Sequence, residues 1–217
     1  MTDSISTRLR TETADAHHQA ESHPLERALV AGSISREQYT EYVSQRYLIH
    51  AALDPLVLQV CDADARFAGL VPSELLQAPN LRADLAYLGV DADQVEACKA
   101  TEALIRQLKD GAATTPASVL GYYYVFEGSK NGARYIARAL AAAWGLRPGG
   151  PGLRYLDPHG ERQRPLWLEF KARLDAIAFR PDERDAMVSA ACRAFELVSA
   201  LDKEIYSAPS KAELTAG

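Results

Sequence analysis

The segment LGYYYVFEGSKNGARYI, residues 120–136, carries the clearest structural signal in the sequence. Its apolar residues recur at helical spacing, yet it contains Gly121, Gly128 and Gly132. Each glycine inside a helix costs about 1 kcal/mol relative to alanine. Gly128 and Gly132 lie one turn apart on the same face, so they present a strip of bare backbone. We expect that strip to lie against another body, either a neighbouring helix or a flat ligand, and both interpretations are open at this point.

The rest of the chain also follows helical periodicity. Ser35, with Gln38 three residues later, is typical of a helix start, and Pro55 should kink or break the long helix that follows. No run of alternating residues is flanked by hairpin turns, so we expect no strands. The expected helices cover about residues 6–21, a long segment after Ser35, 73–88, 93–108, 115–144, 165–177 and 181–206.

Length and composition predict one globular domain. The chain has 217 residues, of which 47% are hydrophobic and 24% charged, which is enough to bury a core. We expect the domain to span residues 1–206, with a flexible tail at 207–217. A net charge of −5 argues against nucleic-acid binding. The polar N-terminal segment and the lack of a bilayer-length apolar stretch predict a cytoplasmic protein without a membrane partner.

His17 is the candidate metal ligand of the first expected helix. It lies at the edge of the face formed by Leu9, Ala16 and Ala20, and Glu21 follows one turn later. A neutral imidazole can bind iron through one nitrogen while a carboxylate orients the other. A partly buried, hydrogen-bonded core histidine is the commoner explanation for such a position, and this helix alone does not separate the two.

Two motifs together resemble the haem oxygenase family, in its bacterial, biliverdin-producing form. Thr13-Ala-Asp-Ala-His17-His-Gln-Ala-Glu21 looks like the proximal helix of that family, and Glu127-Gly-Ser-Lys-Asn-Gly-Ala133 looks like the distal helix of its bacterial members. The order of the motifs and the segment Arg-Ala-Phe-Glu-Leu at 193–197 also match. The resemblance implies an all-α, single-domain multihelical bundle that holds haem between the proximal and distal helices.

The resemblance also implies roles for individual residues. His17 would be the proximal iron ligand, with Glu21 as the partner of its ring. The distal side would be formed by the catalytic residues Gly128, Ser129 and Gly132, with the two glycines close to the haem face. Further haem-binding residues would be Arg10 and Lys171, which occupy two places of basic residues that pair with a haem propionate, and Tyr123 near the pocket.

Two positions depart from the family pattern. Ser129 stands where mammalian-type members carry an aspartate that organises proton-delivering water. Trp167 stands where a second propionate-binding lysine is often found. The first departure affects proton delivery, and the second affects how the haem edge is held.

The function that the resemblance implies is oxidative cleavage of haem by O2 and electrons to biliverdin, Fe2+ and CO. The implied partners are haem, O2 and an electron donor of the ferredoxin or flavoprotein reductase type. The alternative is a haem-binding or haem-sequestering protein of the same fold without turnover. A di-iron oxidase is disfavoured because the sequence contains no Glu-x-x-His pair. A purely structural helical protein would leave the glycine strip and the His17–Glu21 pairing unexplained.

Overall fold

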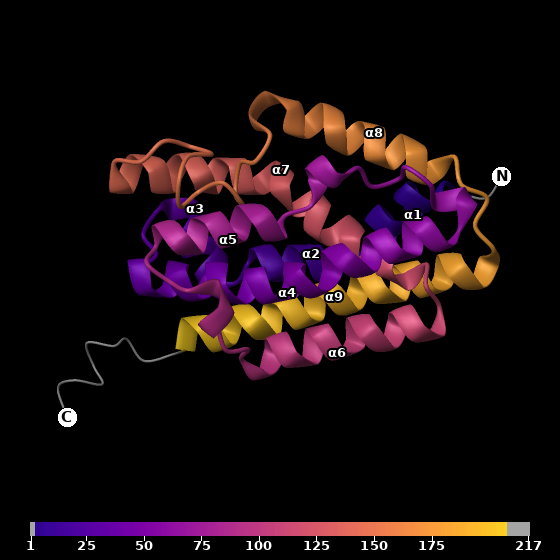
Figure 1. Cartoon of the computed structure of the whole chain (residues 1–217), viewed down its shortest axis with the longest axis horizontal. Helices are drawn as coiled ribbons and strands as arrows, with labels where there is room; N and C mark the ends of the chain where they lie inside the picture. Colours follow the sequence, from indigo (N-terminus) through magenta and orange to yellow (C-terminus); the bar gives the residue numbers. More distant parts are fainter. Residues whose placement is uncertain (1–2, 208–217) are drawn as a thin grey trace.

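The computed structural model describes residues 3–207, and every regular element in that range is a helix. The predicted all-α fold is therefore confirmed. The tail expected at 207–217 lies outside the described residues except for Ser207. The elements are α1 (Ile5–Glu12), α2 (Ala14–Glu21), α3 (Pro24–Ala31), α4 (Arg36–Ala63), η1 (Ala65–Phe67), η2 (Ser73–Leu75), α5 (Ala78–Tyr87), η3 (Ala92–Gln94), α6 (Lys99–Thr114), α7 (Ser118–Trp144), η4 (Gly160–Arg162), α8 (Gln163–Asp175) and α9 (Pro181–Ser207) (Figure 1).

The first expected helix is in fact two helices, which meet at Thr13. The Thr13 hydroxyl donates to the carbonyl of Leu9 at 2.7 Å, and the backbone there leaves the helical region with φ −101° and ψ 2°. A side chain that bonds the preceding turn competes with helix continuation. The chain therefore changes direction four residues before His17.

A short helix, α3, was not expected. Pro24 occupies its first turn, and Gly32 ends it in the left-handed conformation with φ 67°. The Nδ1 atom of His23 accepts a hydrogen bond from the Leu25 amide at 3.2 Å and caps the helix. Proline at the start and glycine at the end are the usual signals of a helix, so the sequence contained the information.

The long helix α4 begins as predicted but runs on through Pro55. The Ser35 hydroxyl accepts from the Gln38 amide at 3.1 Å. Of the two outcomes expected at Pro55, the break is wrong, since the helix continues to Ala63, and the kink stays a prediction. Pro55 and Ala51 are both exposed, so water can bond the carbonyl that the missing proline N–H leaves free.

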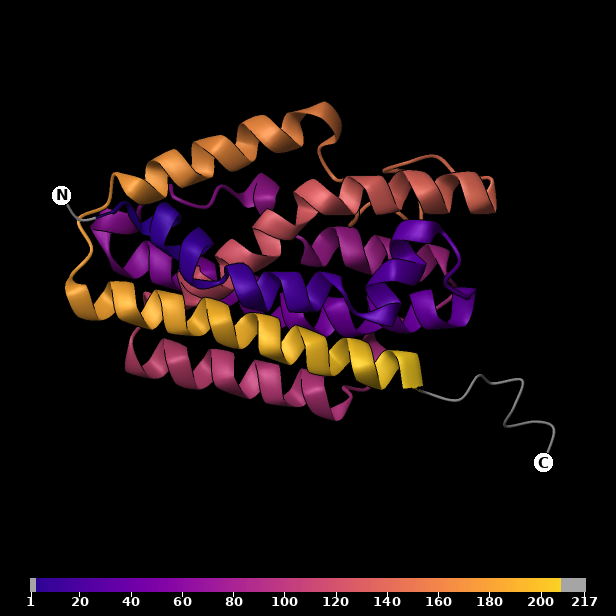
Figure 2. The same cartoon turned by 180° about the vertical axis from the view of Figure 1, so that it is seen from behind.

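The last helix, α9, forms the centre of the bundle. It packs against α1, α2, α3, α4, α6 and α7. At Gly121 the backbone of α7 comes close to that of α9, because a Cβ there would lie 2.1 Å from the Met187 carbonyl oxygen. In both views α6 and α8 lie on opposite sides of the bundle (Figures 1 and 2).

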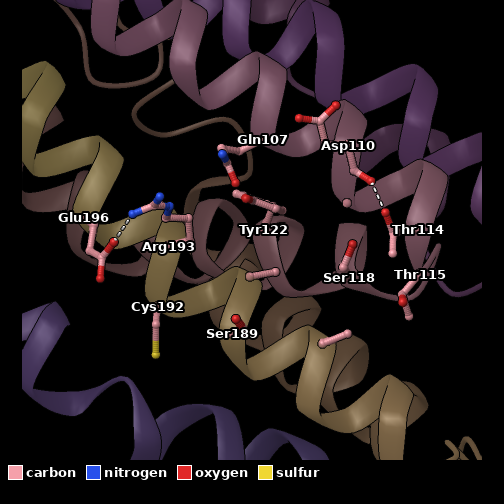
Figure 3. Close-up of a pocket in the computed structure, with 13 residues that line it drawn as sticks. Gln107, Asp110, Thr114, Thr115, Ser118, Tyr122, Ser189, Cys192, Arg193 and Glu196 are labelled. Carbon is pink, nitrogen blue, oxygen red and sulfur yellow. Dashed lines mark hydrogen bonds and ion pairs between the residues drawn. The ribbon is translucent and has the colours of Figure 1, made fainter.

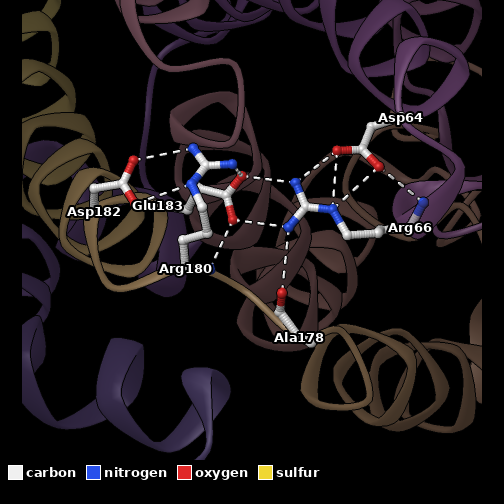
Figure 4. Close-up of polar contacts among 6 residues, drawn as sticks. All are labelled: Asp64, Arg66, Ala178, Arg180, Asp182 and Glu183. Atoms are coloured by element: carbon white, nitrogen blue, oxygen red, sulfur yellow. Dashed lines mark hydrogen bonds and ion pairs between the residues drawn. The ribbon is translucent and has the colours of Figure 1, made fainter.

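A cluster of charged side chains fixes the connection between α8 and α9 against the end of α4 (Figure 4). Arg66 of η1 donates to Glu183 at 2.7 and 3.0 Å, to Asp64 at 2.6 Å and to the Ala178 carbonyl at 3.2 Å. Arg180 also pairs with Glu183, at 2.8 Å. Two-point contacts between arginine and a carboxylate are among the stronger polar contacts in proteins, so this corner holds the C-terminal end of α8 in place.

Cys61 is buried, while Cys98 and Cys192 are half-buried, and all three are free thiols. Among residues 3–207, no helix combines the length and apolar character that a bilayer crossing requires.

Candidate functional site

The His17 imidazole of α2 is accessible and held from two sides. Half of its side chain is exposed (50%). Its ring meets Phe195 of α9 edge-on, with centroids 5.3 Å apart. Its Nδ1 lies 3.6 Å from a Glu21 carboxylate oxygen, which is near enough for an ion pair and longer than a hydrogen bond. The ring is thus oriented while its second nitrogen is left available to a ligand.

The three glycines of α7 have three different surroundings. Gly121 is covered by α9, so the helix-packing interpretation holds there. A Cβ at Gly128 would lie 3.2 Å from the ring of Trp167. At Gly132, apart from its chain neighbours and the adjacent backbone of α7, no atom of residues 3–207 would lie within 4 Å of an added Cβ. Gly132 therefore leaves the backbone of α7 open to a ligand, and His17 does not contact it in this structure.

Side chains next to the glycines bond the backbone of their own helix. Ser129 is exposed, and its hydroxyl donates to the Phe126 carbonyl at 2.9 Å. The Asn131 amide donates to the Gly128 carbonyl at 3.0 Å. Figure 2 shows that α7 changes direction partway along its length, and bonding of this kind is associated with helix bends.

Two predicted site residues are cations without a carboxylate partner in the described part of the chain. Burial raises the pKa of Tyr124, and the positive charge of Arg10 on α1 is close enough to oppose this shift. Lys171 lies on α8, with its Nζ 5.3 Å above the Trp167 ring. Helices α1 and α8 touch, because Asp175 accepts from the Ser6 amide at 2.8 Å. Both cations therefore lie on neighbouring elements and are available to an anionic ligand.

Tyr123 and its neighbour Tyr124 point in different directions. Tyr123 is 1% exposed and packs edge-on against Phe170. Burial raises the pKa of Tyr123 well above its ordinary value. Tyr124 packs instead against Trp167, with centroids 4.9 Å apart. The predicted pocket role of Tyr123 stays a prediction, while Tyr124 lies beside Trp167 and near Arg10.

A buried ion pair on α7 was not predicted from the sequence. Lys130 and Glu127 are each 1% exposed, and their charged atoms are 2.5 Å apart. The second Glu127 oxygen accepts from the Gln163 amide at 3.1 Å, and Lys130 donates to the Leu75 carbonyl at 3.4 Å. Burial lowers the pKa of Lys130, although Glu127 opposes the shift. Two opposite charges three residues apart in an apolar helical segment were the available signal.

A second buried polar pair, His50 and Asp54, has a structural role. The His50 Nδ1 lies 3.1 Å from Asp54, whose other oxygen accepts from the amides of Gln77 and Ala78 at 2.8 Å each. Asp54 thereby caps the start of α5. Burial lowers the pKa of His50, against the effect of Asp54.

A groove on the described surface lies away from these residues. It has a volume of about 580 Å3 between α6, α7 and α9 and includes Ser118, Tyr122 and Ser189 (Figure 3). Arg193 in its wall is paired with Glu196 at 2.7 Å. None of the predicted site residues lines it, so it is separate from the candidate site.

Comparisons with known proteins agree on one family. The family model described as heme oxygenase matches residues 3–204. The chain is similar to heme oxygenase PigA from Pseudomonas aeruginosa, with 31% identity over 191 residues that cover 88% of this chain and 87% of that protein. It is also similar to heme oxygenase 1 from Nostoc sp., with 21% identity over 208 residues, 94% of this chain and 87% of that protein.

Solved structures show the same fold. Heme oxygenase from Leptospira interrogans superposes with a TM-score of 0.84 at 19% identity, covering 93% of this chain and all of that one (100%). Heme oxygenase-2 from Synechocystis, in complex with heme and NO, gives a TM-score of 0.85 at 20% identity, over 94% of this chain and 85% of that one. A TenA homologue from P. horikoshii shares the fold with a TM-score of 0.65, so the fold alone does not specify the activity.

Proposed function

The chain belongs to the haem oxygenase family, and we propose that it binds haem through His17 and cleaves it with O2 and electrons to biliverdin, Fe2+ and CO. The observation that carries the proposal is the accessible His17 imidazole, oriented by Phe195 and Glu21. Partners of this reaction would be haem, O2 and an electron donor of the ferredoxin or flavoprotein reductase type. We propose the cytoplasm as its setting, where such donors are found.

The residues present fit the chemistry of haem. Haem is flat, carries iron at its centre and has two propionate carboxylates on one edge. His17 offers a nitrogen donor to the iron. Arg10 and Lys171 offer two cations that have no carboxylate partner among residues 3–207. Gly132 offers backbone without a side chain, so a flat face can approach α7 there.

On the proximal side, the chain would control the iron ligand. Bound haem supplies the redox chemistry and is itself the substrate. Glu21 lies on the Nδ1 side of the His17 ring, so Nε2 is the nitrogen that would be free for the iron. The edge of Phe195 restricts rotation of the ring. The ligand would therefore be fixed in orientation.

On the distal side, the chain would leave room and hold water. A side chain at Gly132 would occupy the space next to the haem face. The Ser129 hydroxyl donates a hydrogen bond to the Phe126 carbonyl, so the lone pairs of its oxygen can accept hydrogen bonds from water. Water held in this way would supply protons in place of the aspartate-organised water of mammalian-type members.

A spectroscopic titration tests the haem ligand. Hemin is added to the purified protein and to the variants His17→Ala and His18→Ala, and the Soret band is recorded. We expect the wild type and His18→Ala to give the same ligated spectrum and His17→Ala to lose it. His18 is the matched control, since it is the neighbouring exposed histidine of the same helix. Equal behaviour of the two variants would refute the assignment.

A turnover assay separates the enzyme from the alternative of a haem-sequestering protein. Hemin-loaded protein is supplied with a reductant and O2, and the biliverdin absorption band is followed. Appearance of the band supports the oxygenase. A protein that binds hemin tightly and forms no biliverdin with chemical or protein reductants is instead a haem-binding member of the same fold.

A further inference from the structure

The two distal glycines are not equivalent, because Trp167 fills the gap left by one of them. The Cη2 and Cζ2 atoms of Trp167 would lie 3.2 and 3.3 Å from a Cβ at Gly128. Nonbonded carbon atoms approach to about 3.5–4.0 Å, so the indole ring already occupies the volume of a side chain at Gly128. Gly132, one turn further along α7, has no such cover.

Three neighbours hold the Trp167 ring in place. Tyr124 packs against it with centroids 4.9 Å apart, and Phe170 stacks on it at 5.7 Å with an interplanar angle of 21°. The Lys171 ammonium lies above the ring. Aromatic and cation contacts of this kind restrict a side chain to one orientation.

The helix that carries Trp167 is itself fixed at both ends. At its start, Gln163 bonds Glu127, which is paired with Lys130 in the interior. At its end, Asp175 accepts two hydrogen bonds from Ser6, at 2.8 and 2.6 Å. Helix α8 is therefore bonded to α7 at its start and to α1 at its end, which favours the position of Trp167 on Gly128.

We propose that Trp167 determines how haem is seated. The inference rests on the proposed function and deepens it. The indole ring keeps a planar ligand off the backbone at Gly128, so the macrocycle contacts α7 at Gly132. The in-plane orientation of the haem macrocycle decides which meso carbon lies against the distal side, and therefore which biliverdin isomer forms. Gln163 and Glu127 are positioning residues, since they act through α8 on Trp167.

The test compares the two tryptophans of the chain. Trp167→Ala is matched by Trp144→Ala, because Trp144 is also half-buried and lies on α7, packed against Tyr39 with centroids 5.1 Å apart. Each variant is loaded with hemin. The in-plane orientation of the haem is recorded from the NMR shifts of its methyl groups, and the biliverdin isomers are separated by chromatography. Circular dichroism verifies that each variant is folded.

We expect Trp167→Ala to give a new methyl-shift pattern and an isomer ratio changed by about fivefold, which equals ~1 kcal/mol at 1.4 kcal/mol per tenfold. Trp144→Ala should match the wild type in both. Gln163→Leu, which leaves Trp167 itself intact, should shift the methyl pattern in the same direction as Trp167→Ala.

Two failures are distinguishable. If the wild type does not bind hemin, the proposed function falls and the seating role falls with it. If the wild type binds hemin but Trp167→Ala keeps the wild-type methyl pattern, the seating role of Trp167 alone is overturned. A Trp144→Ala variant that changes the pattern as much as Trp167→Ala also overturns it, because the effect is then not specific to Gly128.

Discussion

Replacing Gly132 by alanine should stabilise the haem-free protein and weaken its binding of hemin. Gly132 lies inside α7 in helical conformation, and no described residue beyond the adjacent turns of α7 comes within 4 Å of the added methyl group. The variant therefore gains the helix propensity of alanine, about 1 kcal/mol, without a clash. For a chain of this size that corresponds to a rise in Tm of about 2–4 °C. The same methyl group would occupy the proposed haem face and should cost roughly 1–3 kcal/mol of binding, as overpacking does.

The other two glycines of α7 supply matched controls. At Gly121 the Cβ would lie 2.1 Å from the Met187 carbonyl oxygen and 2.9 Å from its carbon. Both atoms are backbone, so α7 and α9 would have to separate, at a cost of roughly 3 kcal/mol or more. At Gly128 the obstacle is the ring of Trp167. We expect Gly128→Ala to fall between the other two variants in stability.

The assay is urea unfolding of the three haem-free alanine variants, followed by circular dichroism, with a hemin titration of each folded variant. The expected order of stability is Gly132→Ala, wild type, Gly128→Ala and Gly121→Ala. If Gly132→Ala binds hemin as the wild type does, the open backbone at Gly132 does not face the ligand. If Gly121→Ala is as stable as the wild type, the assigned contact between α7 and α9 is wrong.

Three further predictions concern charge. Lys130→Met leaves Glu127 unpaired in the interior and should lower the free energy of unfolding by roughly 3–5 kcal/mol in urea. The double variant Glu127→Gln, Lys130→Met should recover most of that loss. Equal losses in the single and the double variant would contradict the pairing. Burial raises the pKa of Asp54, but bonds from an imidazole and two backbone amides outweigh it and hold the pKa below its ordinary value. The stability that Asp54 contributes is therefore present above the ordinary pKa of about 3.9 and is lost as the pH falls through the lower folded-state pKa. The unfolding free energy of Asp54→Asn should be lower than that of the wild type at pH 7, and it should change less with pH than that of the wild type below about 4. Arg10→Ala and Lys171→Ala should each weaken hemin binding by about threefold to tenfold. The effect should be smaller in high salt, because salt screens charges that water reaches. Hemin titrations at two salt concentrations check this, and an unchanged affinity would show that the residue does not belong to the site.

The helical fold could be predicted because its signals are local. Ser35 caps α4, and Gly145 ends α7 in the left-handed conformation, as glycine there indicates. The division at Thr13 was missed because threonine is compatible with a helix interior, and only the bond of its hydroxyl to Leu9 shows the change of direction. The long helix tolerates Pro55 because its exposed side faces water, which periodicity does not reveal.

The candidate site was predictable at the level of its motifs and not of its packing. His17 and Glu21 lie one turn apart on a helix, and their proximity follows from that spacing alone. Gly128 and Gly132 share one face of α7, so helical spacing alone does not distinguish them. The difference between them depends on where α8 places Trp167. Aromatic residues surround α7 on all sides, so no spacing rule distinguishes the buried Tyr123 from its neighbour.

The central position of α9 has a consequence for how the protein is made. This helix spans residues 181–207 and packs against six earlier helices. On the ribosome, those helices emerge before the segment that completes their core. A nascent chain that ends near residue 180 therefore exposes apolar surface that α9 later buries, and we expect chaperones to bind it until α9 has been made.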